Sequence, residues 1–223
     1  MPFQCLEPKV TPEIIESFKI IWDHLGQSGN WWTAEERLEI AEEARNSNPR
    51  KLWERVGEVE SYSKDNDEVL SPYVRAVVRL VANETSKIDQ RTYDGITKAI
   101  GEDKYAELAA VVSQIIPIDH LSDTLGVERQ ELPNPVDGEL AMERPVGLVE
   151  GVAFLPTFPA EKLPHVAVSL SLAQADNARR MLLVRAMYSG SSFNEMIWEH
   201  RNLSRPQIEL VAARTSALNE CFY

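Results

Sequence analysis

Apolar residues recur at intervals of three and four along two long parts of this chain, and a proline-rich segment lies between them. Ile14 and Phe18 show the spacing near the start, and Ile208 and Val211 show it near the end. Such spacing gives a helix one apolar face. The 223 residues include only 10 glycines and few runs of β-branched residues, which also favours helices over strands. We therefore expect an all-α fold.

Helix starts are marked by capping patterns. Thr33 is followed three residues later by Glu36, and Ser204 is followed three residues later by Gln207. In a capping box, these two residue types satisfy backbone donors of the first helical turn. We expect one helix to begin after Thr33 and another, the last of the chain, to begin after Ser204.

The prolines predict how the chain is divided. Residues 131–164 show no helical spacing, and we interpret them as a linker that packs across the surface. They hold six of the 13 prolines. The flanking parts, 1–130 and 165–223, are then two helical lobes. Pro117 falls inside a predicted helix over 102–125 and is expected to interrupt it, because proline lacks a backbone donor.

Composition excludes several classes of function. The net charge is −12, whereas binding to nucleic acid needs clustered Lys and Arg. No apolar run is long enough to span a bilayer, and the first residues do not form a signal peptide, so we expect a cytoplasmic protein that does not bind membranes. The only cysteines, Cys5 and Cys221, and four scattered histidines match no metal motif. No glycine-rich nucleotide motif is present, so we expect neither a metal nor a cofactor.

Two groups of polar residues have alternative interpretations. Asp119 and His120 follow Pro117, where a kink would expose them to a pocket; otherwise they are capped or solvated. The five glutamates at 35, 36, 39, 42 and 43 are expected to form one solvated helix face.

The last predicted helix carries the most specific pattern. It contains Leu-Ser-Arg-Pro-Gln-Ile-Glu over 203–209 and Ser-Ala-Leu-Asn-Glu-Cys-Phe-Tyr over 216–223. Along an ideal helix Glu209 and Cys221 would lie about 18 Å apart. These two side chains can cooperate only if the helix bends or ends near Cys221, or if another group bridges them.

This segment resembles the motif helix of the alkylhydroperoxidase D-like / carboxymuconolactone decarboxylase superfamily, in its two-lobed peroxidase-related branch. That motif is a Glu, eleven residues, Cys-x-x-Cys, and a His one turn later. Residues 31–42 and 105–127 are similar to helices of the family's first lobe, and 129–135 to its inter-lobe linker. The resemblance implies two related helical lobes, of which 1–130 lacks the cysteine motif and 165–223 ends within it.

The resemblance also implies a reaction, the reduction of small hydroperoxides with electrons from a thiol reductant. Glu209 matches the family's proton relay, and Cys221 matches its resolving cysteine. The attacking residue would directly follow Tyr223. Three interpretations are open: the chain is a fragment, it is a degenerate member without activity, or a UGA codon encoding selenocysteine follows. We favour the third, because a selenolate is mostly ionised where a thiol of pKa about 8.5 is not. On each of these three interpretations, we expect the chain as given to be inactive as a peroxidase.

Two other functions stay open. The chain could be a non-catalytic helical scaffold or binding protein of the same fold. It could also be a decarboxylase-like lyase, for which Arg214 with His120 or His200 would be the candidate residues. The family usually oligomerises, so the resemblance also implies a homo-oligomer.

Overall fold

A computed structural model of the chain describes residues 2–47, 69–161, 164–190 and 202–220. Every regular element in these ranges is a helix, and the only β-type pairings are the isolated bridges Gln27–Val136 and Val149–Thr157. The predicted all-α fold is therefore confirmed. Among the described helices, none has both the length and the apolar character needed to cross a bilayer.

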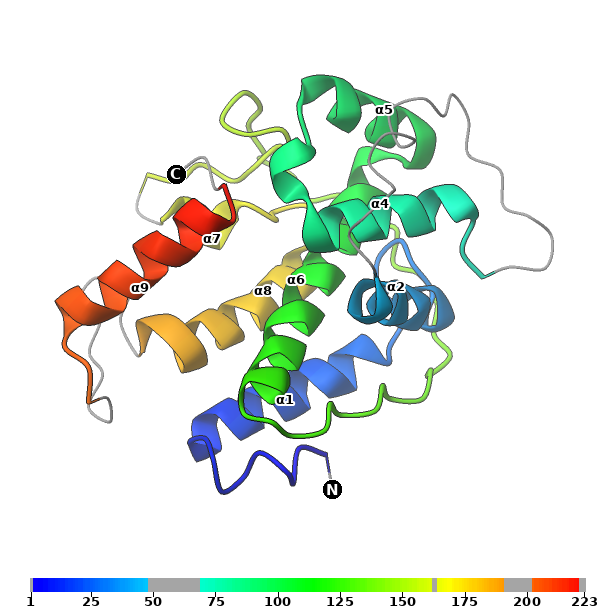
Figure 1. Ribbon diagram of the computed structural model, residues 1–223. Coiled ribbons are helices and arrows are strands. Elements are labelled where there is room, and N and C mark those ends of the chain that lie inside the picture. The colour runs from blue at the N-terminus through cyan, green and yellow to red at the C-terminus, as the bar shows by residue number, and fades with distance from the viewer. Residues whose placement is uncertain (1, 48–68, 162–163, 191–201, 221–223) are drawn as a thin grey trace.

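Where the chain is described without a gap, successive helices are joined by short connections, apart from the long segment that follows α6 (Figure 1). Their bounds are α1 Pro12–Leu25, α2 Ala34–Asn46, α4 Pro72–Asn83, the 3-10 turn η1 Thr85–Lys87, α5 Gln90–Ile100, α6 Glu102–Thr124, α7 His165–Val168, α8 Gln174–Leu183, the π-helical turn η2 Val184–Ser189, and α9 Arg205–Leu218.

Local signals set several of these boundaries. The Thr33 hydroxyl accepts a hydrogen bond from the Glu36 backbone N–H, and the Glu36 carboxylate accepts one from the Thr33 N–H, so the predicted capping box is present at the start of α2. Ser71 caps α4 through the N–H of Val74. These contacts satisfy backbone donors that would otherwise lack partners at the helix starts.

The long helix α6 forms the centre of the fold (Figure 1). It packs against α2, α4, α5 and α8. Contrary to expectation, Pro117 does not interrupt it, and the helix runs on to Thr124. Ile115 and Ile118 on either side of Pro117 are almost completely buried. We attribute the continuity to this burial, since the packing of two large apolar side chains offsets the cost of one missing backbone hydrogen bond.

One hydrophobic core surrounds α6. It extends from Phe3 to Leu183 and contains Leu172 together with residues from α1, α2, α4, α5 and α6. α8 packs directly on α1 and α6, so part of the segment 165–223 contributes to the same core as the first 130 residues. The division into lobes at 1–130 and 165–223 stays a prediction.

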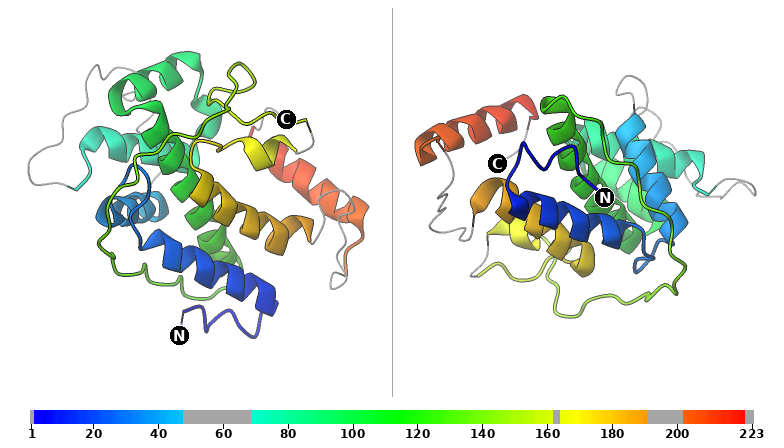
Figure 2. Two further views of the ribbon diagram at one scale, coloured as in Figure 1. Left: turned by 180° about the vertical axis from the view of Figure 1, so that it is seen from behind. Right: turned by 90° about the horizontal axis from the view of Figure 1, so that it is seen from below.

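Segment 131–161 contains no helix and lies over the outside of the first helices (Figure 2). The Trp22 indole N–H donates to the Glu131 carbonyl at 2.7 Å. The Val136 N–H donates to the Gly26 carbonyl at 2.8 Å. A surface segment without helical periodicity is what the proline content predicted for these residues.

Candidate functional site

Glu209, the predicted proton relay, lies in the second turn of α9. Its helix starts as the sequence predicted: the Gln207 side-chain oxygen accepts from the Ser204 backbone N–H at 2.8 Å, and Pro206 is in the first turn. One Glu209 oxygen, Oε2, accepts from the hydroxyl of Tyr188 at 3.0 Å. The other, Oε1, lies 3.8 Å from Nε of Arg205. With 41% of its side chain exposed, Glu209 is accessible to a small molecule.

Tyr188 is a partner that the sequence did not identify. It lies on the π-helical turn η2, where the Gly190 N–H donates to the Arg185 carbonyl five residues earlier at 2.9 Å. Single π turns occur frequently at functional sites because they redirect side chains that a regular helix would place elsewhere. The only signal in the sequence is Gly190, whose φ of 67° favours glycine where the turn ends. The phenol and carboxylate together form a chain along which a proton can pass.

Cys221, the predicted resolving thiol, lies outside the described residues. The described part of α9 ends at Leu218, and Glu220 has a left-handed φ of 53°. A left-handed residue just past the last turn is a common way to terminate a helix. Among the described residues, α9 therefore ends before residue 221.

A second group of ionisable residues is fully enclosed between α2, α6 and α8. Arg37 is 0% exposed and faces two carboxylates. Its Nη1 donates to Oε1 of Glu107 at 2.7 Å, and its Nη2 donates to Oδ1 of Asp176 at 2.8 Å. A further bond from Nη1 to Oδ2 of Asp176, at 3.1 Å, makes the second pair bidentate. We call Arg37, Glu107 and Asp176 the buried ion cluster.

Neighbouring groups add hydrogen bonds to the carboxylates of the buried ion cluster. Nε2 of His24 lies 3.1 Å from Oδ1 of Asp176, and Nε2 of Gln114 donates to the same oxygen at 3.1 Å. The backbone N–H of Trp31 donates to Oε2 of Glu107 at 2.8 Å. Arg37 Nε is buried without an acceptor. A Cβ placed on Gly29 would lie 1.8 Å from Oε1 of Glu107, so glycine at 29 leaves room for that carboxylate.

Burial and charge act in opposite directions on the two carboxyl groups. Burial alone would raise the pKa of Asp176, but the charge of Arg37 and the hydrogen bonds from His24 and Arg37 outweigh it, so this pKa lies below its ordinary value. The pKa of Glu107 is raised by burial, against the lowering effect of Arg37. The cluster side chains are at most 5% exposed, so a substrate does not reach them. The arrangement holds α8 on the core.

Other candidate residues have structural partners. Asp119 is buried and receives two hydrogen bonds from Arg45, at 2.7 and 3.0 Å, whereas His120 is exposed. The two residues therefore do not share a pocket. The predicted solvated face of α2 is wrong for two of its five glutamates, Glu36 and Glu43, which are 9% exposed. Glu36 closes the capping box, and Glu43 pairs with arginines of α4.

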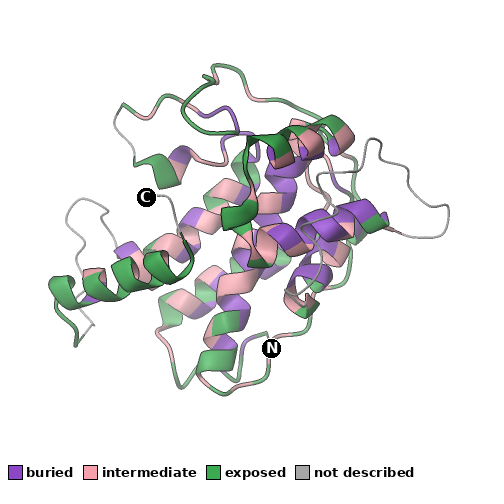
Figure 3. Cartoon of the chain, turned by 45° about the horizontal axis from the view of Figure 1, so that its top comes forward, coloured by how far each residue is buried: buried purple, intermediate pink, exposed green. Residues whose placement is uncertain are grey.

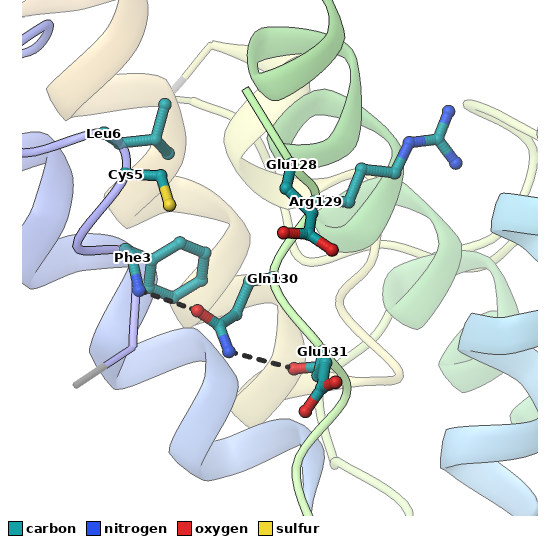
Figure 4. A pocket seen from close by; sticks show the side chains of 7 residues that line it. All are labelled: Phe3, Cys5, Leu6, Glu128, Arg129, Gln130 and Glu131. Carbon is teal, nitrogen blue, oxygen red and sulfur yellow. Dashed lines mark hydrogen bonds between the residues drawn. The ribbon is translucent and has the colours of Figure 1, made fainter. Parts of the chain in front are cut away.

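Cys5 is a free thiol at the edge of a small groove of about 170 Å³. Figure 4 shows it across the groove from Glu128 and Gln130, where the Phe3 N–H donates to the Gln130 side-chain oxygen at 2.7 Å. In the described part of the chain, no three His, Cys, Asp or Glu side chains are grouped as a metal site requires.

Comparison with known proteins identifies no relative of this chain. No family model, no curated protein and no solved structure matches this chain. The functional assignment thus depends on the residue pattern of α9 and on the geometry around Glu209.

Proposed function

We propose that this chain is a peroxidase-related redox protein that reduces hydroperoxides, with two helical lobes of the alkylhydroperoxidase D-like type. The single observation that supports it most is the hydrogen bond between Tyr188 and Glu209. It gives a half-exposed carboxylate a proton-carrying partner at the position that the motif assigns to a proton relay. We further propose that the protein acts in the cytoplasm, where thiol reductants are available.

In the proposed reaction, the attacking thiolate or selenolate is the residue that follows Tyr223. It takes the terminal oxygen of the hydroperoxide, and the O–O bond breaks. The leaving alkoxide receives a proton from Glu209, which regains it through Tyr188 or solvent. The resulting sulfenic or selenenic acid condenses with the thiol of Cys221, releases water and forms a disulfide or selenosulfide bond. An external dithiol then reduces that bond by exchange.

The first measurement is the nucleotide sequence after the Tyr223 codon. An in-frame UGA or Cys codon followed by the rest of the motif supports the proposal. A UAA or UAG codon, or unrelated sequence, removes its nucleophile and leaves the scaffold as the leading function.

The activity test compares hydroperoxide consumption, with a thiol reductant in excess, by the extended chain and by the 223-residue chain. We expect turnover only in the extended chain. Glu209→Gln should lower that turnover about a hundredfold, the lower range for loss of a general acid. Glu13→Gln, an exposed carboxylate in the first turn of α1, is the matched control and should leave it unchanged. Equal turnover by both chain lengths would contradict the proposal.

The variant Tyr188→Phe tests whether Tyr188 takes part in proton transfer or only contacts Glu209 at the surface. If Tyr188 acts through Glu209, Tyr188→Phe lowers turnover by about tenfold, as expected for a hydrogen bond to a charged group. It should have no further effect once Glu209 is Gln, because the two residues act as one unit. Additive losses in the double variant would show that Tyr188 does not work through Glu209.

A non-catalytic scaffold that forms a homo-oligomer is the second candidate function, and the exposure of α9 supports it. Of the described α9 residues only Ile208 is buried, while Leu210, Val211 and Leu218 are 71%, 59% and 65% exposed (Figure 3). An isolated helix of 14 residues is marginal in water, so a partner surface would stabilise it. A scaffold predicts an oligomer that Leu210→Lys dissociates, with no peroxide turnover at either chain length.

The lyase alternative gains no such support. In the described part of the chain, His120 and Arg214 share no hydrogen bond or ion pair, and His200 lies outside it.

A further inference from the structure

A cleft of about 460 Å³ opens between α1, α7 and α8, away from the buried ion cluster. Its apolar lining comes mainly from Ile20, Phe158, Met181 and Leu182, and its charged lining from Arg179 and Arg185. Small-molecule sites usually occupy concave, mostly apolar spaces of about 300–1,000 Å³ with a few polar groups that orient the ligand. The volume of this open cleft falls in that range, and its lining combines apolar side chains with polar groups.

The charge of the cleft is opposite to that of the chain. None of the residues that line it is Asp or Glu, although the chain carries 35 acidic and 23 basic residues. The one carboxylate of α8, Asp176, lies on the buried side of that helix and pairs with Arg37. The cleft therefore presents positive charge without a neighbouring carboxylate among its described lining residues.

The arginines of the cleft also differ from most others in the molecule. Each of the following arginines forms an ion pair with a carboxylate: Arg37, Arg45, Arg75, Arg79, Arg129, Arg144 and Arg205. Within the described ranges, Arg179 and Arg185 have no such pair. Nη1 of Arg179 reaches only the Ala175 carbonyl, at 3.4 Å, and its Nε is buried without an acceptor. A guanidinium has five donors, so most of those on Arg179 have no protein acceptor among these residues.

The adjacent Arg180 does not line the cleft but supports it. It donates to three uncharged oxygens, those of Asn177, Val166 and Ser169, and to no described carboxylate. Its contacts tie α7 to α8, which fixes the wall of the cleft. Arg179 is partly buried, and a cation in such a place without a protein carboxylate is costly, so a bound anion would lower that cost.

We propose that this cleft binds an amphipathic monocarboxylate, with its carboxylate on Arg179 and Arg185 and its aliphatic chain against the apolar wall. A carboxylate fits because it accepts two parallel hydrogen bonds from one guanidinium. The aliphatic chain fits because Ile20 is exposed at 38% and the neighbouring lining residues Phe158 and Leu182 are partly exposed. The site is independent of Glu209 and Cys221, so it stands whether or not the chain is a peroxidase.

The test is calorimetric titration of the 223-residue chain with octanoate, octanol and acetate. Octanoate should bind at least about tenfold more tightly than octanol, which lacks the charge, and than acetate, which lacks the chain. Binding should weaken with added salt, because the head-group contact is ionic.

Variants locate the site. Arg179→Gln and Arg185→Gln should each weaken octanoate binding by about tenfold and leave octanol binding unchanged. Arg91→Gln is the matched control: it removes the same charge from an exposed position on α5 and should leave binding unchanged. Ala178→Trp, at an exposed position in the lining, should obstruct the cleft and abolish binding. Far-UV circular dichroism checks that each variant is folded.

Three results would overturn the proposal. One is equal affinity for octanoate and octanol, and another is a loss in Arg91→Gln as large as in Arg179→Gln. The third is binding to vesicles of anionic phospholipid without binding of monomeric octanoate, which would identify the arginines as a lipid-surface contact instead.

Discussion

Arg37→Met tests whether the buried ion cluster holds α8 on the core. The substitution keeps an unbranched side chain that follows the aliphatic part of arginine, but it removes the guanidinium cation that separates Glu107 from Asp176. These two carboxylates, 1% and 5% exposed, then lose the guanidinium that pairs with both of them. Removing one partner of a buried ion pair typically costs about 3–5 kcal/mol, because the remaining charge stays desolvated. We expect a loss of that size in the free energy of unfolding.

Arg144→Met supplies the matched control. Arg144 also pairs with two carboxylates, with Glu102 at 2.6 Å and Asp103 at 2.7 Å, but its side chain is 44% exposed. Exposed ion pairs contribute only about 0.2–1 kcal/mol, so this variant should lose less than about 1 kcal/mol. Burial is the main difference between the two arginines, and the contrast between the variants measures its effect.

The assay is urea unfolding followed by tryptophan fluorescence and circular dichroism at pH 7. In a background with Asp176→Asn, Arg37→Met should cost less than in the wild-type chain, because only one buried carboxylate is then left unpaired. If Arg37→Met proves no more destabilising than Arg144→Met, the buried ion cluster does not stabilise the fold.

The cost of Arg37→Met should also depend on pH. In the wild-type protein the folded-state pKa of Asp176 is below its ordinary value of about 3.9, so its contribution to stability is present above that value and is lost only as the pH falls through the folded-state pKa. In Arg37→Met the lowering effect of the Arg37 charge and hydrogen bonds is gone, so both carboxyl pKa values are higher than in the wild type, although the hydrogen bonds from His24 and Trp31 remain. Lowering the pH from 7 should therefore stabilise the variant more than the wild type, in which only the pKa of Glu107 is raised, and the difference in unfolding free energy between the two proteins should narrow.

Two further predictions concern single residues. Gly29→Ala should destabilise the protein by about 1–3 kcal/mol, as overpacking does, because the new Cβ would lie 1.8 Å from the fixed carboxylate of Glu107. Gly138→Ala is the control in the same unfolding assay, because the nearest atom to its new Cβ would lie at 3.6 Å. Burial raises the pKa of Tyr105 to about 12, so the folded state keeps a proton that the unfolded state loses near pH 10. The free energy of unfolding should therefore fall from pH 10 to pH 12, and less steeply in Tyr105→Phe; identical slopes would disprove the assignment.

Several features of the fold follow from the sequence alone, and they are the local ones. The helix after Thr33 starts where the capping box with Glu36 predicts, because both partners lie within one turn. The start of α9 after Ser204 and the absence of helix in 131–161 are local in the same sense. The pattern also indicated Glu209, which α9 does present half-exposed on its surface.

Tertiary structure alone decided the contacts between distant residues. Arg37 binds Glu107 across 70 residues and Asp176 across 139, and no periodicity in the sequence pairs them. The hydrogen bond between Tyr188 and Glu209 depends on a π-helical turn, and Gly190 is the only signal of that turn in the sequence. Pro117 stays within a continuous helix because neighbours far away in sequence bury both of its flanks. The physical reason is common to all three. Helix periodicity and capping depend on interactions between residues within about one turn of each other, so the sequence shows them directly. Charge pairing and burial depend on which elements the folded chain brings together, so the sequence does not show them.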